Sequence, residues 1–169
     1  MELIFPTMEH KQAALEYRQE HFDCGVTEIH GDGGLDGAAT FEDWLEWIQN
    51  APQIKFSEEL VPATIYFGIH DDKIVGTIQI RHKLNERLLK TYGHIGYGVR
   101  PSERRKGYAT KMLKLALEKC RELGINKVLI SCDRDNIASA KTILKNGGVF
   151  DKEFAEKNGN IVQQYWITL

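Results

Sequence analysis

The sequence has few cysteines and no long hydrophobic run, and each of these absences excludes a class of protein. Cys24, Cys120 and Cys132 are odd in number and form no CxxC pair, so the sequence predicts neither a disulfide framework nor a zinc ribbon. The longest apolar-rich run, LVPATIYFGI at 60–69, is too short for a bilayer-spanning helix, which takes about 20 residues. The start, MELIFPTMEHK, lacks the basic and apolar regions of a signal peptide. We therefore expect a cytoplasmic protein that does not contact membranes.

The sequence also has almost no net charge. It contains 22 basic and 24 acidic residues, for a formal charge of −2, which argues against a surface built to bind a polyanion. Nucleic acid is therefore not an expected partner, although a local basic site remains compatible with this balance. The 169 residues, 42% of them hydrophobic and 27% charged, predict a single domain over 1–169 that can bury one sizeable core.

Several nucleotide and metal motifs are absent as well. No GxGxxG follows a strand, because GYGVRPSERRKG spaces its glycines differently, and no GxxxxGK[ST] loop exists. DRDN at 133–136 resembles the start of a calcium loop but lacks the required glycine and distal glutamate. It is more typical of a helix cap, and we assign no metal site.

The first 60 residues carry helical patterns on either side of a glycine-rich segment. We expect a short strand at 2–5, a helix at 8–22, and a mobile loop at 23–39, where the glycines disfavour regular structure. Thr40 followed by Asp43 predicts a cap that opens a helix reaching about Asn50. Two helices joined by a flexible loop would make a lid.

The rest of the chain alternates strands and helices. Two β-rich runs at 63–82 predict a hairpin, and strands are expected at 94–100, 127–132 and the C-terminal IVQQYWITL. Apolar residues at helical spacing predict a helix over 107–123, with Gly124 as its C-cap, and another over 137–146. The strand–helix–strand unit at 94–132 implies one parallel strand pair with a right-handed crossover. The fold class is therefore α+β, a mostly antiparallel sheet flanked by helices.

The stretch RRKGYAT at 104–110 has three possible meanings. The N–H groups at the start of a helix, with a glycine that lets a ligand approach, form a site for phosphate. The same cations could contact nucleic acid or form a solvated basic turn. The preceding strand favours the first meaning, because Gly96 and Gly98 leave one of its faces almost without side chains, which would suit a thin ligand ending in a phosphate. Tight packing of a helix on that face is the alternative.

The run VRPSERRKGYA at 99–109, followed by a helix, KVLISC and NIAS, resembles the coenzyme A core of the GNAT N-acetyltransferases. The resemblance covers roughly residues 64–169, and residues 1–60 would help to shape the acceptor side. It implies a splayed parallel strand pair, acetyl-CoA as co-substrate, and direct transfer of the acetyl group to a small-molecule or peptide amine. It also implies a set of residues that contact coenzyme A: Val99, Arg104, Arg105, Lys106, Gly107, Tyr108, Ala109, Thr110, Asn136 and Ser139.

The catalytic groups are less clear from the resemblance. Many members of the family carry a tyrosine seven residues after the asparagine as general acid, and here that position is Ile143. Tyr97, Tyr108, Cys132 or Tyr165 could replace it, and of these we take Tyr97 as the candidate acid. His94 is the best titratable candidate for the base. The missing tyrosine leaves a second hypothesis, a non-catalytic acyl-CoA sensor on the same fold. The acceptor is not encoded in any motif, and exposed apolar residues such as Trp166 would suit a homodimer edge.

Overall fold

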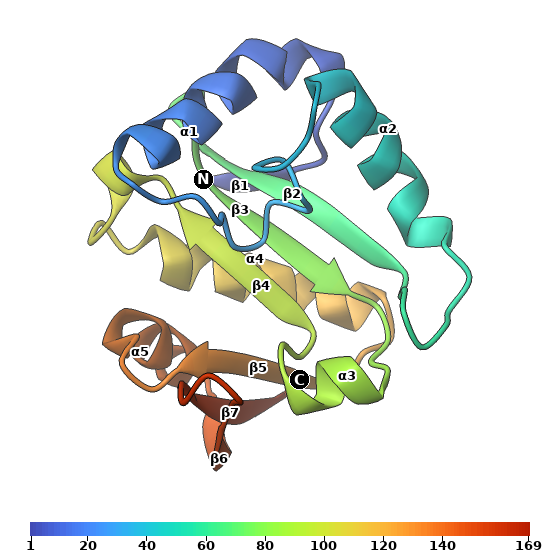
Figure 1. Ribbon diagram of the computed structural model, residues 1–169, viewed down its shortest axis with the longest axis vertical. Helices are drawn as coiled ribbons and strands as arrows, with labels where there is room; N and C mark the ends of the chain where they lie inside the picture. The colour runs from blue at the N-terminus through green and yellow to red at the C-terminus, as the bar shows by residue number, and fades with distance from the viewer.

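The strands form two antiparallel sheets (Figure 1). The computed structural model describes residues 1–169, and its sheets have the orders β1-β2-β3-β4 and β5-β7-β6. The strands are β1 (Glu2–Ile4), β2 (Ala63–His70), β3 (Lys73–Arg81), β4 (Ile95–Val99), β5 (Lys127–Asp133), β6 (Val149–Ala155) and β7 (Ile161–Thr168). All strand pairs within the two sheets are antiparallel.

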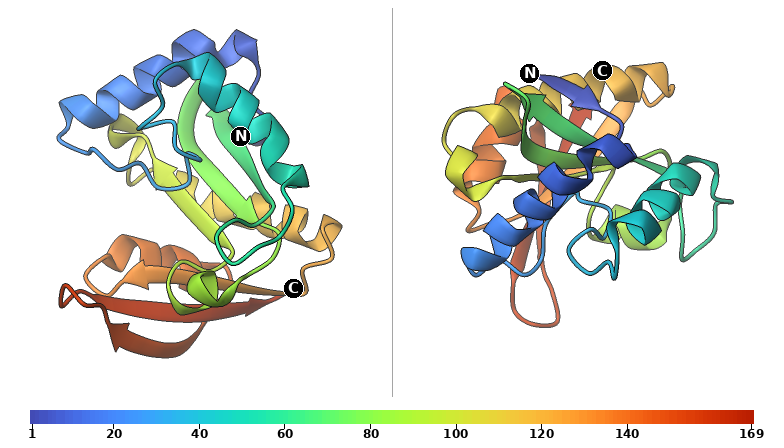
Figure 2. Two further views of the ribbon diagram at one scale, coloured as in Figure 1. Left: turned by 45° about the vertical axis from the view of Figure 1, so that its right-hand side comes forward. Right: turned by 90° about the horizontal axis from the view of Figure 1, so that it is seen from above.

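Helices cover both faces of the first sheet (Figure 2). Two helices near the N-terminus lie on one face, the longest helix lies on the other, and a fourth packs beside β5. The helices are α1 (Lys11–Asp23), α2 (Phe41–Asn50), α3 (Glu86–Lys90), α4 (Tyr108–Glu122) and α5 (Ile137–Lys145), with short 3-10 turns at Met8–His10, Ala51–Gln53 and Pro101–Glu103. None of the helices combines the length and apolar character that a membrane crossing needs.

Two hydrophobic cores lie on the opposite faces of the first sheet. On one face α1 and α2 bury Tyr17, Trp44 and Phe67. On the other, Met112 and Leu113 of α4 pack with residues of both sheets. Because α4 contributes to the core that both sheets share, it fixes the position of the second sheet against the first.

The predicted elements around the hairpin and α4 are confirmed. Asp71 and Asp72 connect β2 to β3 with φ values of 49° and 57°, the conformation of a two-residue turn that matches strand twist. In α4 the buried residues recur at helical spacing: Met112, Leu113, Ala116, Leu117 and Cys120. Gly107 begins this helix with φ 84° and Gly124 follows it with φ 73°, and both values favour glycine.

The predicted fold class is confirmed, and β4 and β5 have the splayed arrangement that the resemblance implied. Both strands run in the same direction in Figure 1, but they belong to different sheets. They are linked only before β4 begins, by an isolated bridge of antiparallel type between Gly93 and Ile130. His94 N donates to Leu129 O at 2.7 Å beside it. Beyond this point β4 has no partner strand on the side that faces β5.

Two expectations about the chain need correction. The glycine-rich segment is folded against the first sheet, because Ile29 and Leu35 are buried and the Trp44 indole donates to Asp32 O at 2.9 Å. Its glycines provide turn conformations, so the prediction of a mobile lid is not supported by this packing. The strand β6 was not expected from the sequence, because its residues VFDKEFA are nearly all exposed and show no clean alternation.

Candidate functional site

The glycine face of β4 is covered by the chain itself. A Cβ on Gly98 would lie 2.7 Å from His30 O, and a Cβ on Gly31 would lie 2.4 Å from Gly96 O. Thr77 holds this crossing in place by donating from Oγ1 to His30 O at 3.2 Å. The expectation that a thin ligand would lie on this face is therefore wrong, and so is the alternative of a helix. The glycines admit the backbone of the loop between α1 and α2.

The free edge of β4 presents backbone groups without a partner strand instead. Arg81 N donates to His94 O and Arg100 N to Val75 O, which makes the even positions of β4 the hydrogen-bonded partners of β3. In an antiparallel pair the intervening residues direct N–H and C=O to the opposite side. Those residues are Ile95, Tyr97 and Val99, whose amides consequently point toward β5.

The start of α4 contains six consecutive backbone N–H groups without a protein acceptor. They belong to residues 105–110, and the first amide of this region to donate is Lys111 N, to Gly107 O at 3.2 Å. Arg105 and Gly107 both have positive φ, 64° and 84°, a backbone conformation that also occurs in anion-binding nests. No atom lies within 4 Å of a Cβ placed on Gly107, and the glycine is open to a ligand.

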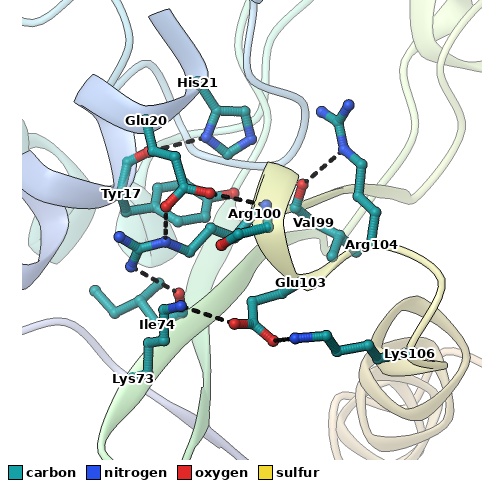
Figure 3. A network of polar contacts seen from close by, with 11 residues as sticks. Tyr17, Glu20, His21, Lys73, Ile74, Val99, Arg100, Glu103, Arg104 and Lys106 are labelled. Carbon is teal, nitrogen blue, oxygen red and sulfur yellow. Dashed lines mark hydrogen bonds and ion pairs between the residues drawn. The ribbon is translucent and has the colours of Figure 1, made fainter. Parts of the chain in front are cut away.

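The three cations of RRKGYAT differ in what they contact (Figure 3). Arg104 Nε donates to Val99 O at 3.3 Å, which links it to the free edge of β4. Lys106 lies 2.8 Å from Glu103, and Lys73 reaches the other oxygen of that carboxylate at 2.7 Å. The hydrogen bonds from Lys106 and Lys73 lower the pKa of Glu103. Arg105 is exposed and makes no ion pair, so its charge is available to a bound anion.

A carboxylate on α1 fixes the turn between β4 and α4 (Figure 3). Glu20 accepts from Arg100 Nε at 2.5 Å and from Ser102 N at 2.8 Å. Burial alone would raise the pKa of Glu20, but these hydrogen bonds outweigh it and lower the pKa to about 2. Glu20 therefore stays ionised at neutral pH and positions the segment that leads into the six free amides. The sequence gives no signal for this pair, whose members are 80 residues apart.

Tyr97 and Ser139 meet between β4 and α5. Their hydroxyl oxygens are 2.7 Å apart, and Asn136 Oδ1 accepts from Ser139 N at 3.1 Å as the cap of α5. Burial raises the pKa of Tyr97 to about 12, so its phenol is protonated at neutral pH. Ile143 is fully buried in the core. The phenol of Tyr97 is one acidic group that lies against the first turn of α5, and the Cys132 thiol also contacts Ser139.

His94 is held at the point where β4 and β5 separate. Its side-chain Nδ1 accepts from the Leu129 backbone N–H at 2.9 Å, and the backbone N–H of His94 donates to Leu129 O. Burial lowers the pKa of His94 to about 4, and the charge of Arg81 adds to this effect. Because Nδ1 accepts this hydrogen bond, the neutral ring carries its proton on Nε2, and the nitrogen that could take up a proton is already engaged. With this pKa, His94 would be a weak base.

Other acidic residues and hollows lie apart from these groups. Asp32 uses both carboxylate oxygens to accept from Gly34 N and Asp36 N, so it is occupied within its own loop. Two surface hollows, one beside Arg121 and Leu169 and one beside Lys90 and Lys157, contain none of the predicted site residues. No cluster of His, Cys, Asp or Glu has the arrangement of a metal site.

Comparisons with known proteins identify the family. The family model described as "Acetyltransferase (GNAT) domain" matches residues 12–149. The chain therefore belongs to the GNAT acetyltransferase family. No curated protein sequence matches it.

Solved structures share the fold at low sequence identity. A ribosomal L7/L12 α-N-protein acetyltransferase in complex with coenzyme A has a TM-score of 0.71 and 16% identity, covering 99% of this chain and 93% of its own. The microcin C7 self-immunity acetyltransferase, in complex with acetyl-CoA and AMP, has a TM-score of 0.69 and 18% identity over 99% and 91%. Spermidine N-acetyltransferase from Vibrio cholerae has a TM-score of 0.68 and 10% identity, covering 99% of this chain and 95% of its own. These proteins act on different substrates, and the fold alone does not identify the acceptor.

Proposed function

We propose that this protein is an acetyl-CoA-dependent N-acetyltransferase that transfers an acetyl group directly to an amine. The observation that carries the proposal is the row of six free amides at residues 105–110, which begins where the free edge of β4 ends. A pyrophosphate needs several N–H donors at one place, and an extended pantetheine arm needs an unpaired strand edge. The chain provides both, in the order that the parts of coenzyme A require.

The cofactor side of the site is built mainly from backbone. The amides of residues 105–110 would hold the pyrophosphate, with Arg104 and Arg105 adding charge, while Lys106 shares its charge with Glu103. Val99 would pair with the pantetheine arm, and Asn136 and Ser139 would border it at α5. These residue roles agree with the contacts described above, and neighbours of the same fold are complexes with acetyl-CoA or coenzyme A.

The chemistry requires a donor for developing negative charge and an acid for the departing sulfur. Acetyl-CoA supplies a thioester, whose carbonyl oxygen gains negative charge as an amine attacks. The N–H groups of Tyr97 and Val99 face the β5 side of the edge, where they would stabilise that charge. The Tyr97 phenol would protonate the thiolate, and its high pKa keeps it protonated until then.

The proposed base is His94, and the acceptor is proposed to bind on the side of the site formed by residues 1–60. His94 remains the proposed base, although its pKa of about 4 makes it weak and its Nδ1 would have to release Leu129 N to take a proton. An amine that binds in its neutral form would need little help. Residues 1–60 would shape the acceptor side, because the loop they contain crosses β4 at Gly96 and Gly98. We expect the acceptor to be a small-molecule or peptide amine, as in the named activities of the structural neighbours.

A non-catalytic acyl-CoA sensor is the second candidate, favoured by Ile143 and by the occupied Nδ1 of His94. Two measurements separate the candidates. Acetyl-CoA should raise the melting temperature in both cases, whereas release of free thiol in the presence of an amine panel is expected only of the enzyme. Binding without thiol release across polyamines, amino acids, aminoglycosides and peptide N-termini would favour the sensor, and absence of both signals would refute coenzyme A binding.

A further inference from the structure

Arg81 ends β3 beside the residues that precede the free edge of β4. Its Nη1 donates to Gly93 O at 3.2 Å and lies 3.9 Å from a Cβ placed on Gly96. Tyr97, whose amide faces the β5 side, is the next residue after Gly96. Since a strand advances about 3.3 Å per residue, the guanidinium lies within roughly two residue lengths of the Tyr97 amide, which is proposed to face the thioester carbonyl. It also lies on the face of the sheet that α1, α2 and their loop cover.

The positive charge of Arg81 is only partly exposed and has no acidic partner. No carboxylate oxygen lies within 4 Å of it, although most other charged side chains close to the site are paired. Burial lowers the pKa of Arg81 to about 10, and the nearby charge of Arg87 adds to this effect. Besides Gly93 O, its favourable neighbour is the Tyr92 ring, whose centroid is 5.8 Å from Cζ. A desolvated cation without a counter-charge is costly to fold, which points to a partner outside the chain.

The remaining donors of Arg81 are open to such a partner. Of its three nitrogens, only Nη1 makes a side-chain hydrogen bond. No fully buried side-chain nitrogen or oxygen in the molecule lacks a hydrogen-bond partner, so Nε and Nη2 must reach solvent. These two nitrogens form one side of the guanidinium fork, the geometry that pairs with the two oxygens of a carboxylate.

We propose that Arg81 binds a carboxylate of the acceptor, and that the acceptor is accordingly a small molecule carrying both an amine and a carboxylate, such as an amino acid. This inference rests on the proposed N-acetyltransferase function and specifies its substrate class. Arg81 acts in specificity, because it holds the end of the acceptor opposite the attacking amine. The short distance from Gly96 to the guanidinium favours a small acceptor over one whose charge is many bonds from the amine.

Matched acceptors test the proposal. Alanine and alaninamide, and β-alanine and β-alaninamide, differ in the carboxylate and should be compared by kcat/KM at saturating acetyl-CoA, with rates computed for the neutral amine. We expect the wild type to prefer the carboxylates by about 10- to 100-fold, which is the range for a charge-assisted bidentate pair. Arg81→Gln should abolish the preference, and Arg81→Lys should retain part of it because the charge remains without the fork.

The controls separate this inference from the proposed function. Arg121→Gln removes an exposed charge at the far end of α4 and should leave the preference intact. Acetyl-CoA should raise the melting temperature of every variant equally. If that shift is absent in the wild type, the proposed function fails. If it is present and the carboxylates show no advantage in turnover, or in thermal stabilisation with coenzyme A bound, only the role of Arg81 is overturned. If Arg81→Gln does not fold, the comparison of wild type with Arg81→Lys still decides, because an equal preference in both overturns the bidentate contact.

Discussion

Replacing Gly107 with glutamate should remove acetyl-CoA binding and leave the fold intact. Gly107 has φ 84°, where a residue with a side chain costs roughly 1–2 kcal/mol, but nothing lies within 4 Å of the added Cβ. For a chain of this length we therefore expect the melting temperature to fall by about 2–8 °C, at roughly 2–4 °C per kcal/mol. The carboxylate would stand among the six free amides and repel a pyrophosphate. The stabilisation given by acetyl-CoA, about 2.7 kcal/mol at 100 times Kd in the wild type, should then be lost.

Gly124→Glu is the matched control for this variant. Gly124 lies at the other end of α4, has φ 73°, and likewise has no atom within 4 Å of an added Cβ. It should suffer the same backbone strain and a similar fall in melting temperature, while the thermal shift produced by acetyl-CoA stays at the wild-type value. The assay is thermal unfolding with and without the ligand. Equal ligand-induced shifts in the two variants would refute the assignment of residues 105–110 as the pyrophosphate site.

Three further perturbations test the groups around the site. Tyr97→Phe should lower kcat by about 100-fold or more while the thermal shift given by acetyl-CoA is unchanged. Tyr66→Phe, which removes a phenol on β2, is the inert control, and a wild-type kcat in Tyr97→Phe would exclude Tyr97 as the acid. The pKa of His94 is about 4 in the folded chain against an ordinary 6.5, so the unfolded chain binds more protons between these pH values and stability falls as pH drops from 6.5 to 4. His94→Gln should flatten this dependence of the unfolding free energy on pH, measured by urea unfolding. An unchanged slope would contradict the burial of His94. The pKa of Glu20 is lowered from 4.5 to about 2, so its contribution to stability is present above pH 4.5 and is lost as pH falls toward 2. Glu20→Gln should therefore be less stable than the wild type at pH 7 and nearly equal to it at pH 2. The same variant should raise the KM for acetyl-CoA more than it lowers kcat.

The local parts of the site could be predicted from the sequence because local rules determine them. The apolar spacing of α4, the glycine before it and the Thr40 cap, whose oxygen accepts from Asp43 N at 3.1 Å, all depend on residues within a few positions of each other. The same holds for the Asp71–Asp72 turn. Each of these features is specified by backbone geometry and hydrogen bonding within one element or one turn.

The contacts between distant segments could not be predicted from the sequence. Gly96 and Gly98 indicated that something approaches β4 closely, but only the fold shows that it is the His30–Gly31 backbone. The register of β3 against β4, which decides that the Tyr97 amide faces the free edge, also follows from pairing that no motif encodes. No motif marks Arg81 in the sequence, because what distinguishes it is that no carboxylate lies near it in the folded chain.

The two halves of the proposed site are mechanically connected, and this bears on how the acceptor and cofactor sides act together. Glu20 of α1 holds Arg100 and Ser102, which lead into the free amides, and the loop that follows α1 lies directly on Gly98. Residues 1–60 therefore contact both β4 and the turn that follows it. A movement of α1 on acceptor binding would be transmitted to the turn before α4 through a carboxylate that is ionised at neutral pH. For this reason we expect that a bound acceptor changes the acetyl-CoA affinity of Glu20→Gln less than it changes that of the wild type. Variants within residues 105–110 should bind acetyl-CoA more weakly, but a bound acceptor should change their affinity by the same factor as in the wild type.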